Sequence, residues 1–345
     1  MLWFDGSVRW HRKPGSAIIR VAQGRTLILA DKLLAVDVFT GRHLWETPVV
    51  STGSNARPEM VAADDAIYVT NSKTCLVLDP STGESTSQID VPAEVALPSN
   101  TSWSRIYVRG DFLVGTAGPH VVCINRHTGK LLWKHACQHD KLSISVGSQR
   151  VYCAEIKKLN RKPTQAELQQ KPRTRAFSLE TGEKLWEIPD ASELRLSEAQ
   201  DLLLTVKAVY RAKDGSLLRE SKTPFFIAGD LMVTTTADKL RTFNLLTGKQ
   251  ISDELTWYRR GCTGLRAGSH IATTRFQGNA AYVDLISRKV TPLWNIRSAC
   301  NNNLVPANGI LNVPNLTGGC ECNYTPTSVA FVPATVFETP TSKNK

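Results

Sequence analysis

A short phrase recurs seven times along this 345-residue chain and constrains its fold more than any other feature. Each copy has a strand-like run, usually an Asp or Asn, and a turn that closes on Gly four residues later. The glycine position falls at residues 41, 83, 129, 182, 215, 248 and 288, the last being Arg288. Successive copies lie 33 to 53 residues apart, which is typical of a four-stranded propeller blade.

Each part of the phrase has a physical role in a hairpin. An Asp or Asn that opens a turn can accept hydrogen bonds from amides two residues on, and Gly adopts the positive φ of a hairpin bulge. The preceding runs, such as residues 33–36, 121–124 and 281–283, are rich in apolar and branched side chains that suit a half-buried strand. The phrase therefore predicts a tight turn between two strands.

In the best copies a Trp stands four residues after the Gly. An indole is large and flat enough to fill the wedge between two twisted sheets. We therefore predict a tryptophan docking motif that packs one blade against the next. Its residues are Gly41, Trp45, Gly129, Trp133, Gly182, Trp186 and Trp294.

The predicted architecture is an all-β, eight-bladed β-propeller of four-stranded antiparallel blades, with seven blades as the alternative. The propeller is expected to span residues 1–335, with a disordered tail over 336–345. We expect residues 308–314 and 329–333 to complete the last blade, and the two chain ends to pair there, because closure removes exposed sheet edges. A sandwich with scattered glycine turns is disfavoured because sandwiches rarely keep such a period.

The net charge of +11 is compatible with binding to nucleic acid, anionic lipid or acidic polysaccharide. Part of this excess lies in an insertion at residues 157–175, which also accounts for the longest interval. Nucleic acid is disfavoured as a partner because neither interleaved aromatic residues nor a nucleic-acid motif accompanies the charges. The insertion is either a solvated loop or a polyanion-binding module. Its basic residues are Lys157, Lys158, Arg161, Lys162, Lys171, Arg173 and Arg175.

Most of the cysteines fall into two groups. Cys75, Cys123 and Cys153 lie in apolar strand runs, where a thiol behaves as a small buried hydrophobe. The second group lies among Gly, Asn and Pro in the last third of the chain, where disulfides would stabilise an irregular blade. Free thiols and a four-thiolate metal site are the alternatives. The disulfide candidates are Cys262, Cys300, Cys320 and Cys322.

A direct bond between Cys320 and Cys322 is disfavoured, because their spacing in an extended strand does not suit one. Each would then pair with Cys262 or Cys300.

One alternating group, His135, Cys137 and His139, would face one side of a strand and is a weak candidate for zinc or copper. The alternative is a simple continuation of the strand after Trp133, so the leading expectation is no metal.

Catalytic motifs are scarce. The sequence contains no His-Glu-x-x-His, Gly-x-Ser-x-Gly or phosphate loop, so we predict no catalytic residue. It also shows neither an apolar signal segment at its start nor a run of about 18 apolar residues, so we expect no signal peptide and no transmembrane segment.

The phrase Asp-x-x-Thr-Gly-x-x-Leu-Trp, at residues 37–45 and with Asn at 125–133, resembles the repeat of PQQ-like β-propellers. That family includes quinoprotein alcohol dehydrogenases and a lipoprotein of the outer-membrane assembly machinery. Residues 298–309, 319–324 and 327–330 further resemble the closing segment of PQQ-like repeat proteins of planctomycete-type bacteria.

The resemblance implies a non-catalytic scaffold in the periplasm or cell envelope that binds a protein or an envelope polymer. The alternative is a PQQ-dependent dehydrogenase, in which PQQ and calcium would be cofactors. The family's enzymes carry a vicinal cysteine pair over the quinone, and this sequence has no adjacent cysteines. We therefore expect no cofactor, and the oligomeric state stays open.

Overall fold

The computed structural model shows a chain built from short β-strands, with two 3-10 helices, Ala93–Val95 (η1) and Glu198–Gln200 (η2). It describes residues 18–30, 32–49, 58–95, 102–139, 141–156, 173–220, 226–236, 238–257, 265–294, 304–307, 310–313 and 329–331. These residues belong to two compact units, Val49–Phe225 and the combination of Met1–Pro48 with Phe226–Lys345. Across the described ranges, neither helix has the length and apolar character needed to cross a membrane.

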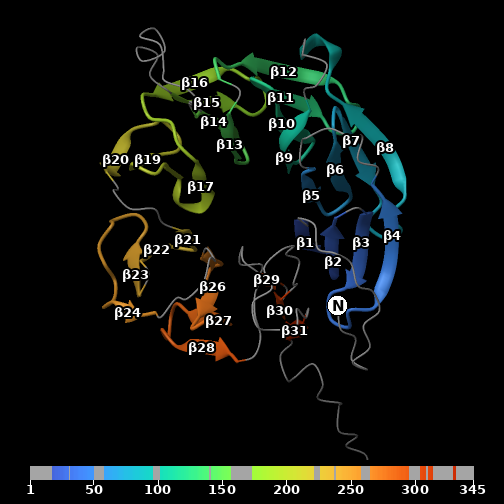
Figure 1. The fold of residues 1–345 in the computed structure, drawn as a ribbon. Helices are drawn as coiled ribbons and strands as arrows, with labels where there is room; N and C mark the ends of the chain where they lie inside the picture. The colour runs from blue at the N-terminus through green and yellow to red at the C-terminus, as the bar shows by residue number, and fades with distance from the viewer. Residues whose placement is uncertain are drawn as a thin grey trace, which may run out of the picture. The chain divides into compact units, whose positions relative to one another are not determined.

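The unit Val49–Phe225 contains four antiparallel sheets of four strands each, and strands that follow one another in sequence are neighbours. The first strands of successive sheets contact one another, β5 with β9, β9 with β13 and β13 with β17, and the fourth strands form the opposite edges (Figure 1). The strands of the first two sheets are β5 (Met60–Ala62), β6 (Ile67–Asn71), β7 (Thr74–Leu78), β8 (Ser85–Asp90), β9 (Trp103–Arg109), β10 (Phe112–Ala117), β11 (His120–Asn125) and β12 (Leu131–Ala136). Those of the next two are β13 (Leu142–Val146), β14 (Arg150–Glu155), β15 (Thr174–Ser178), β16 (Lys184–Ile188), β17 (Arg195–Ser197), β18 (Leu202–Leu204), β19 (Ala208–Arg211) and β20 (Leu217–Glu220).

The other unit combines the first sheet of the chain with its last three. Three of these sheets have four strands, and the last has three, in the order β29-β30-β31. The strands of the first two are β1 (Ile18–Ala22), β2 (Arg25–Leu29), β3 (Lys32–Asp37), β4 (His43–Pro48), β21 (Phe226–Ala228), β22 (Leu231–Thr235), β23 (Lys239–Asn244) and β24 (Leu255–Thr256). The remaining strands are β25 (Arg266–Ala267), β26 (Ile271–Phe276), β27 (Asn279–Asp284), β28 (Val290–Leu293), β29 (Val305–Ala307), β30 (Ile310–Val313) and β31 (Val329–Phe331).

The fold is therefore an all-β propeller with seven four-stranded antiparallel blades among the described residues. The alternative of seven blades is confirmed, and the leading prediction of eight such blades is one too high. The reason lies in the repeat: each of its seven copies forms the turn between the third and fourth strand of a sheet, and the three-stranded sheet has no copy. The predicted segments 308–314 and 329–333 do pair there, as β30 with β31. The predicted pairing of the two chain ends and the tail at 336–345 involve residues outside the described ranges.

The repeated turn has the predicted internal hydrogen bonds. In the first copy, Asp37 Oδ1 accepts hydrogen bonds from the amides of Phe39 (3.0 Å) and Thr40 (2.7 Å). The amide of Gly41 donates to the carbonyl oxygen of Asp37 at 2.9 Å, and Gly41 has a φ of 67°. This left-handed conformation favours glycine because it has no Cβ. In the seventh copy Arg288 adopts it instead, with a φ of 60°.

A second hydrogen bond fastens this turn to the turn between the first two strands of the same sheet. In the third blade, the amide of Arg126 donates to the carbonyl oxygen of Asp111 at 2.9 Å. Equivalent bonds occur in five other blades, and the second blade has Pro80, which lacks an amide hydrogen, at this position. The second turn residue is thus held by its backbone, and the third is exposed.

Two of the predicted tryptophans contact the next sheet within the unit Val49–Phe225. Trp133 donates its indole N–H to the carbonyl oxygen of Leu179 at 2.8 Å, and a Cβ placed on Gly182 would lie 2.5 Å from its Cγ. Trp186 likewise donates to the carbonyl oxygen of Ala212 at 3.2 Å. Each indole therefore lies against the repeated turn of the following sheet, where only a glycine leaves room for it.

The other members of the predicted set differ in their surroundings. Trp45 is 8% exposed, whereas Trp294 is 57% exposed. Trp294 follows the end of β28 and stands six residues after Arg288 instead of four. It therefore does not occupy the strand position from which Trp133 reaches a neighbouring sheet, and its role in packing a blade stays a prediction. Gly129 has a φ of 70° and open space beyond its Cα.

Candidate interaction surface

The third residue of the repeated turn is exposed in all seven copies, but its chemistry differs between the two units. In the unit Val49–Phe225 it is polar or charged, as Ser81, His127, Glu180 and Lys213. In the other unit it is apolar, with exposed fractions of 43% for Phe39, 44% for Leu246 and 72% for Ile286. We refer to Phe39, Leu246 and Ile286 as the apolar tips.

The hydrogen bonds that define the turns do not involve the side chains of the apolar tips. The backbone amides of Phe39 and Ile286 donate hydrogen bonds to Oδ1 of the Asp that opens each turn, at 3.0 Å and 2.8 Å. The turn is therefore stabilised by the backbone of these residues. Their side chains project outward while the residue before each one, such as Val38 (2% exposed), is buried. Single exposed apolar side chains are common on protein surfaces, and what sets these three apart is that they occupy the same turn position in three sheets of one unit.

Further exposed apolar residues lie along the fourth strands. Leu132 on β12, Leu185 on β16 and Leu217 on β20 are 41%, 44% and 58% exposed. These strands form the edges of their sheets, where unpaired backbone groups are open to contact. The charged neighbours Lys134 and Lys184 on the same strands are typical of protected edges.

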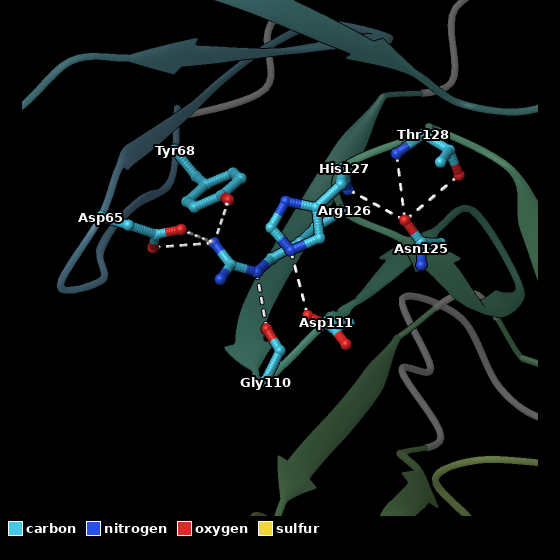
Figure 2. A network of polar contacts seen from close by, with 8 residues as sticks. All are labelled: Asp65, Tyr68, Gly110, Asp111, Asn125, Arg126, His127 and Thr128. Atoms are coloured by element: carbon cyan, nitrogen blue, oxygen red, sulfur yellow. Dashed lines mark hydrogen bonds and ion pairs between the residues drawn. The ribbon is translucent and has the colours of Figure 1, made fainter.

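In the third blade, the second residue of the turn is Arg126, and it connects this blade to the second (Figure 2). Its Nη1 donates to both carboxylate oxygens of Asp65 at 2.8 Å and to the hydroxyl of Tyr68 at 2.7 Å. Its Nε donates to the carbonyl oxygen of Gly110 at 2.6 Å. Because the Arg126 side chain is only 11% exposed and carries a charge, we expect these bonds to rank among the stronger polar contacts of the unit.

The electrostatics of this Arg126 cluster follow from its contacts. The hydrogen bonds from Arg126 hold the pKa of Asp65 below its ordinary value, although burial acts in the opposite direction. Burial raises the pKa of Tyr68. Next to the cluster, His127 Nε2 lies 3.0 Å from Asp111 Oδ1, and both side chains are well exposed. The cluster is a positioning element between two blades, and its charges are satisfied internally.

The base of the predicted basic insertion is also occupied by internal ion pairs. Arg175 bonds to Glu155 and, through Nε at 2.7 Å, to Glu187, while Arg173 also pairs with Glu187. Burial raises the pKa of Glu187, but the bonds from Arg173 and Arg175 outweigh this and lower it overall. Two of the seven basic residues assigned to polyanion binding are therefore engaged in ion pairs. The other five, Lys157, Lys158, Arg161, Lys162 and Lys171, lie outside the described residues.

A buried carboxylate joins the fourth and fifth blades. Asp190, 7% exposed, accepts hydrogen bonds through Oδ2 from Thr205 Oγ1 (2.6 Å) and Tyr210 OH (3.2 Å). Its Oδ1 is buried and has no hydrogen-bond partner among the described residues. Burial, followed by the neighbouring Asp190, raises the pKa of Tyr210 to about 12.

The weak metal candidates do not come together as one ligand set. The His135 ring stacks on Phe177 with a centroid distance of 4.0 Å, and the Sγ of Cys137 lies 4.0 Å from the Sγ of Cys153. His139 follows three residues after the end of β12. Within the described ranges, no group of three or more His, Cys, Asp or Glu side chains is arranged to hold a metal ion. We derive no chemistry through PQQ.

The remaining cysteines divide according to what the structure describes. Cys75, Cys123 and Cys153 are free and buried in strands. Burial raises the pKa of the Cys75 and Cys123 thiols to about 12 in each case. The disulfide candidates Cys262, Cys300, Cys320 and Cys322 lie outside the described residues.

Sequence reasoning missed the Arg126 cluster and the Asp190 network. A signal for the first was present, because Arg126 stands where five of the other six copies carry Val, Leu or Ala. Its partner Asp65 is 61 residues away, and no local pattern links the two. Asp190 offered no comparable signal, since its partners are recognisable only once the sheets are assembled.

The sheets and their repeated turns define a β-propeller of PQQ-like repeats. A family model described as outer membrane protein assembly factor BamB matches residues 4–85 and 74–289. The chain belongs to this family. A search of curated proteins finds no match.

Solved structures with this fold include proteins of different kinds. BamB from Moraxella catarrhalis is 13% identical, covers 88% of this chain and 97% of its own, and has a TM-score of 0.57. The computationally designed Ika8 protein is 13% identical over 89% of this chain and 94% of its own, with a TM-score of 0.62. Quinohemoprotein alcohol dehydrogenase ADHIIG from Pseudomonas putida HK5 is 10% identical over 88% of this chain and 70% of its own, with a TM-score of 0.59. At these identities the similarity shows the fold alone.

Proposed function

We propose that this protein is a non-catalytic scaffold of the bacterial cell envelope that binds a protein partner through the apolar tips Phe39, Leu246 and Ile286. The observation that carries the proposal is their exposure, 43%, 44% and 72%, at one repeated turn position. The family description, an outer membrane protein assembly factor, supports a role in protein assembly and an envelope location. The fold alone does not determine the function, so the proposal is tested at the apolar tips.

Desolvation of the tips provides the driving force for binding. Removing apolar surface from water contributes about 25 cal/mol per Å², and an exposed aromatic or branched aliphatic side chain supplies a compact anchor. The equivalent positions in the other unit, Ser81, Glu180 and Lys213 among them, lack this surface. The partner is therefore expected to be a protein with an apolar contact region.

Site-specific cross-linking in the producing cells tests the proposal. A photoreactive phenylalanine analogue is introduced at Phe39, Leu246 or Ile286 and, as matched controls, at Ser81, Glu180 or Lys213. We expect one shared cross-linked protein from the apolar positions and none above background from the polar ones. Changing the other two tips to Ser should then reduce the cross-link formed from the remaining one. Equal cross-linking from both sets of positions would contradict the assignment.

A quinone-dependent dehydrogenase is the alternative from another class and rests on the likeness to PQQ-like repeats. Titration of the pure protein with PQQ and calcium, followed by dye-linked alcohol oxidation, distinguishes the two functions. The scaffold proposal expects neither stoichiometric binding nor oxidation. Either result would favour the enzyme.

A further inference from the structure

Two free thiols face one another across neighbouring blades. Cys153 lies on β14 of the fourth blade and is 2% exposed, and Cys137 follows β12 of the third blade and is partly exposed. Their Sγ atoms are 4.0 Å apart, whereas a disulfide bond is about 2.05 Å long. The two sulfurs are therefore in direct contact without being bonded.

Backbone contacts hold Cys137 beside Cys153. The amide of Cys137 donates to the carbonyl oxygen of Pro119 at 2.7 Å. The amide of the next residue, Gln138, donates to Glu155 Oε2 at 2.7 Å, and Glu155 is on the same strand as Cys153. The segment that carries Cys137 is thus attached to its own blade on one side and to β14 on the other. This pre-organisation lowers the entropy lost when the two sulfurs bond.

We propose that Cys137 and Cys153 form an inter-blade disulfide by thiol–disulfide exchange with a small disulfide, a modification that goes beyond the proposed scaffold function. Because Cys137 is the partly exposed member of the pair, it is the sulfur that a solution oxidant reaches first. Cys153 is the resolving partner, enclosed in the apolar cluster between the two blades together with Ile144 and Phe177.

The exchange takes place in two balanced steps. The Cys137 thiolate attacks one sulfur of the small disulfide, which forms a mixed disulfide and releases one thiolate. The Cys153 sulfur then attacks the Cys137 sulfur and displaces the second thiolate, which leaves with the proton lost by Cys153. Overall, the protein loses two hydrogens and the small disulfide becomes two thiols.

The environment of Cys153 favours this order of attack. Its hydrogen bond with Cys137, followed by burial, holds the pKa of the Cys153 thiol well above its ordinary value. A protonated, enclosed thiol is a poor nucleophile toward reagents in solution. Its attack on a mixed disulfide at Cys137 is instead intramolecular, because the two sulfurs already lie 4.0 Å apart.

Peptide mapping of the folded full-length protein tests the proposal. The protein is incubated with glutathione disulfide, its remaining thiols are alkylated in denaturant, and a non-reducing digest is analysed by mass spectrometry. We expect a linked peptide that contains Cys137 and Cys153 and is lighter by two hydrogens than its two reduced parts. Cys75 and Cys123, which are buried in β7 and β11, serve as internal controls and should be recovered alkylated.

Thermal unfolding provides a second readout. The cross-link closes a loop of about 16 residues, so oxidation should raise the melting temperature by about 5 °C, and a reductant should reverse the shift. The Cys137→Ser variant, altered at the partly exposed position, should show no such shift. Two results would overturn the proposal: an alkylated Cys153 after oxidation, or a stable glutathione adduct on Cys137 with Cys153 still free.

Discussion

Replacing Gly182 by Ala tests how strongly the third and fourth blades depend on the contact with Trp133. Gly182 has a φ of 72°, and a non-glycine residue in the left-handed region costs about 1 to 2 kcal/mol. The added Cβ would also lie 2.5 Å from Cγ, 2.7 Å from Cδ2 and 2.8 Å from Cβ of Trp133. Overpacking of this kind costs about 1 to 3 kcal/mol, so we expect a total loss of about 2 to 5 kcal/mol.

The same substitution at Gly129 is a matched control. Gly129 has a nearly identical φ of 70°, but nothing lies within 4 Å of the added Cβ. The preceding blade carries Ser87 at the position equivalent to Trp133. Gly129→Ala should therefore lose only the backbone contribution of about 1 to 2 kcal/mol.

Urea denaturation of the wild type and the two variants measures how much each substitution lowers the free energy of unfolding. The two losses are then compared. Because the indole of Trp133 causes the extra loss at Gly182, a Trp133→Ala background should reduce the cost of Gly182→Ala to that of Gly129→Ala. Equal losses for the two glycine variants in the wild-type background would refute the reasoning. An extra loss that persists without the indole would refute it as well.

Three other perturbations test the remaining clusters. The pKa of Asp65 is lowered in the folded state by Arg126, so this carboxylate stabilises the fold above its unfolded pKa of about 4, and the contribution is lost as the pH falls through the lower folded value. The stability advantage of wild type over Asp65→Asn should thus be present at pH 7 and shrink below pH 4 in urea titrations, and a constant advantage would contradict the assignment. Thr205→Val removes one of the two donors to Oδ2 of the buried Asp190 and should cost about 1 to 3 kcal/mol in the same assay, and a loss below about 0.5 kcal/mol would show that Tyr210 alone satisfies this oxygen. Phe39→Ser should change the free energy of unfolding by less than about 0.5 kcal/mol, since its side chain is exposed, and a larger loss would show that the tip supports the fold.

The sequence predicts local geometry well where a single turn determines it. The side chain of Asp37 accepts the expected amides, and Gly41 has the expected positive φ. Both follow from interactions between residues at most four positions apart, and such interactions repeat from copy to copy. The contact of Trp133 with Gly182 also recurs because the repeat places an indole and a glycine at constant positions in consecutive blades.

Contacts that occur once were harder to predict. The bond between Arg126 and Asp65 joins residues 61 positions apart, and Asp65 is not part of the repeated phrase. The expected line of His135, Cys137 and His139 assumed that the strand continues, but β12 ends at Ala136. The thiol of Cys137 then lies beside Cys153 of the next blade, a contact that only the packing of two sheets creates.

The second and third residues of the repeated turn differ in how much the structure of the blade depends on them. The residue at its second position is held by its amide in six blades, whereas the third side chain is exposed in all seven, with His127 bonded to Asp111 in the third blade. Substitutions at the other six third positions leave the hydrogen-bonded loop intact, so mutation can alter recognition there without an accompanying loss of folding. A chain of this design can acquire or exchange binding partners during evolution while its interior stays unchanged.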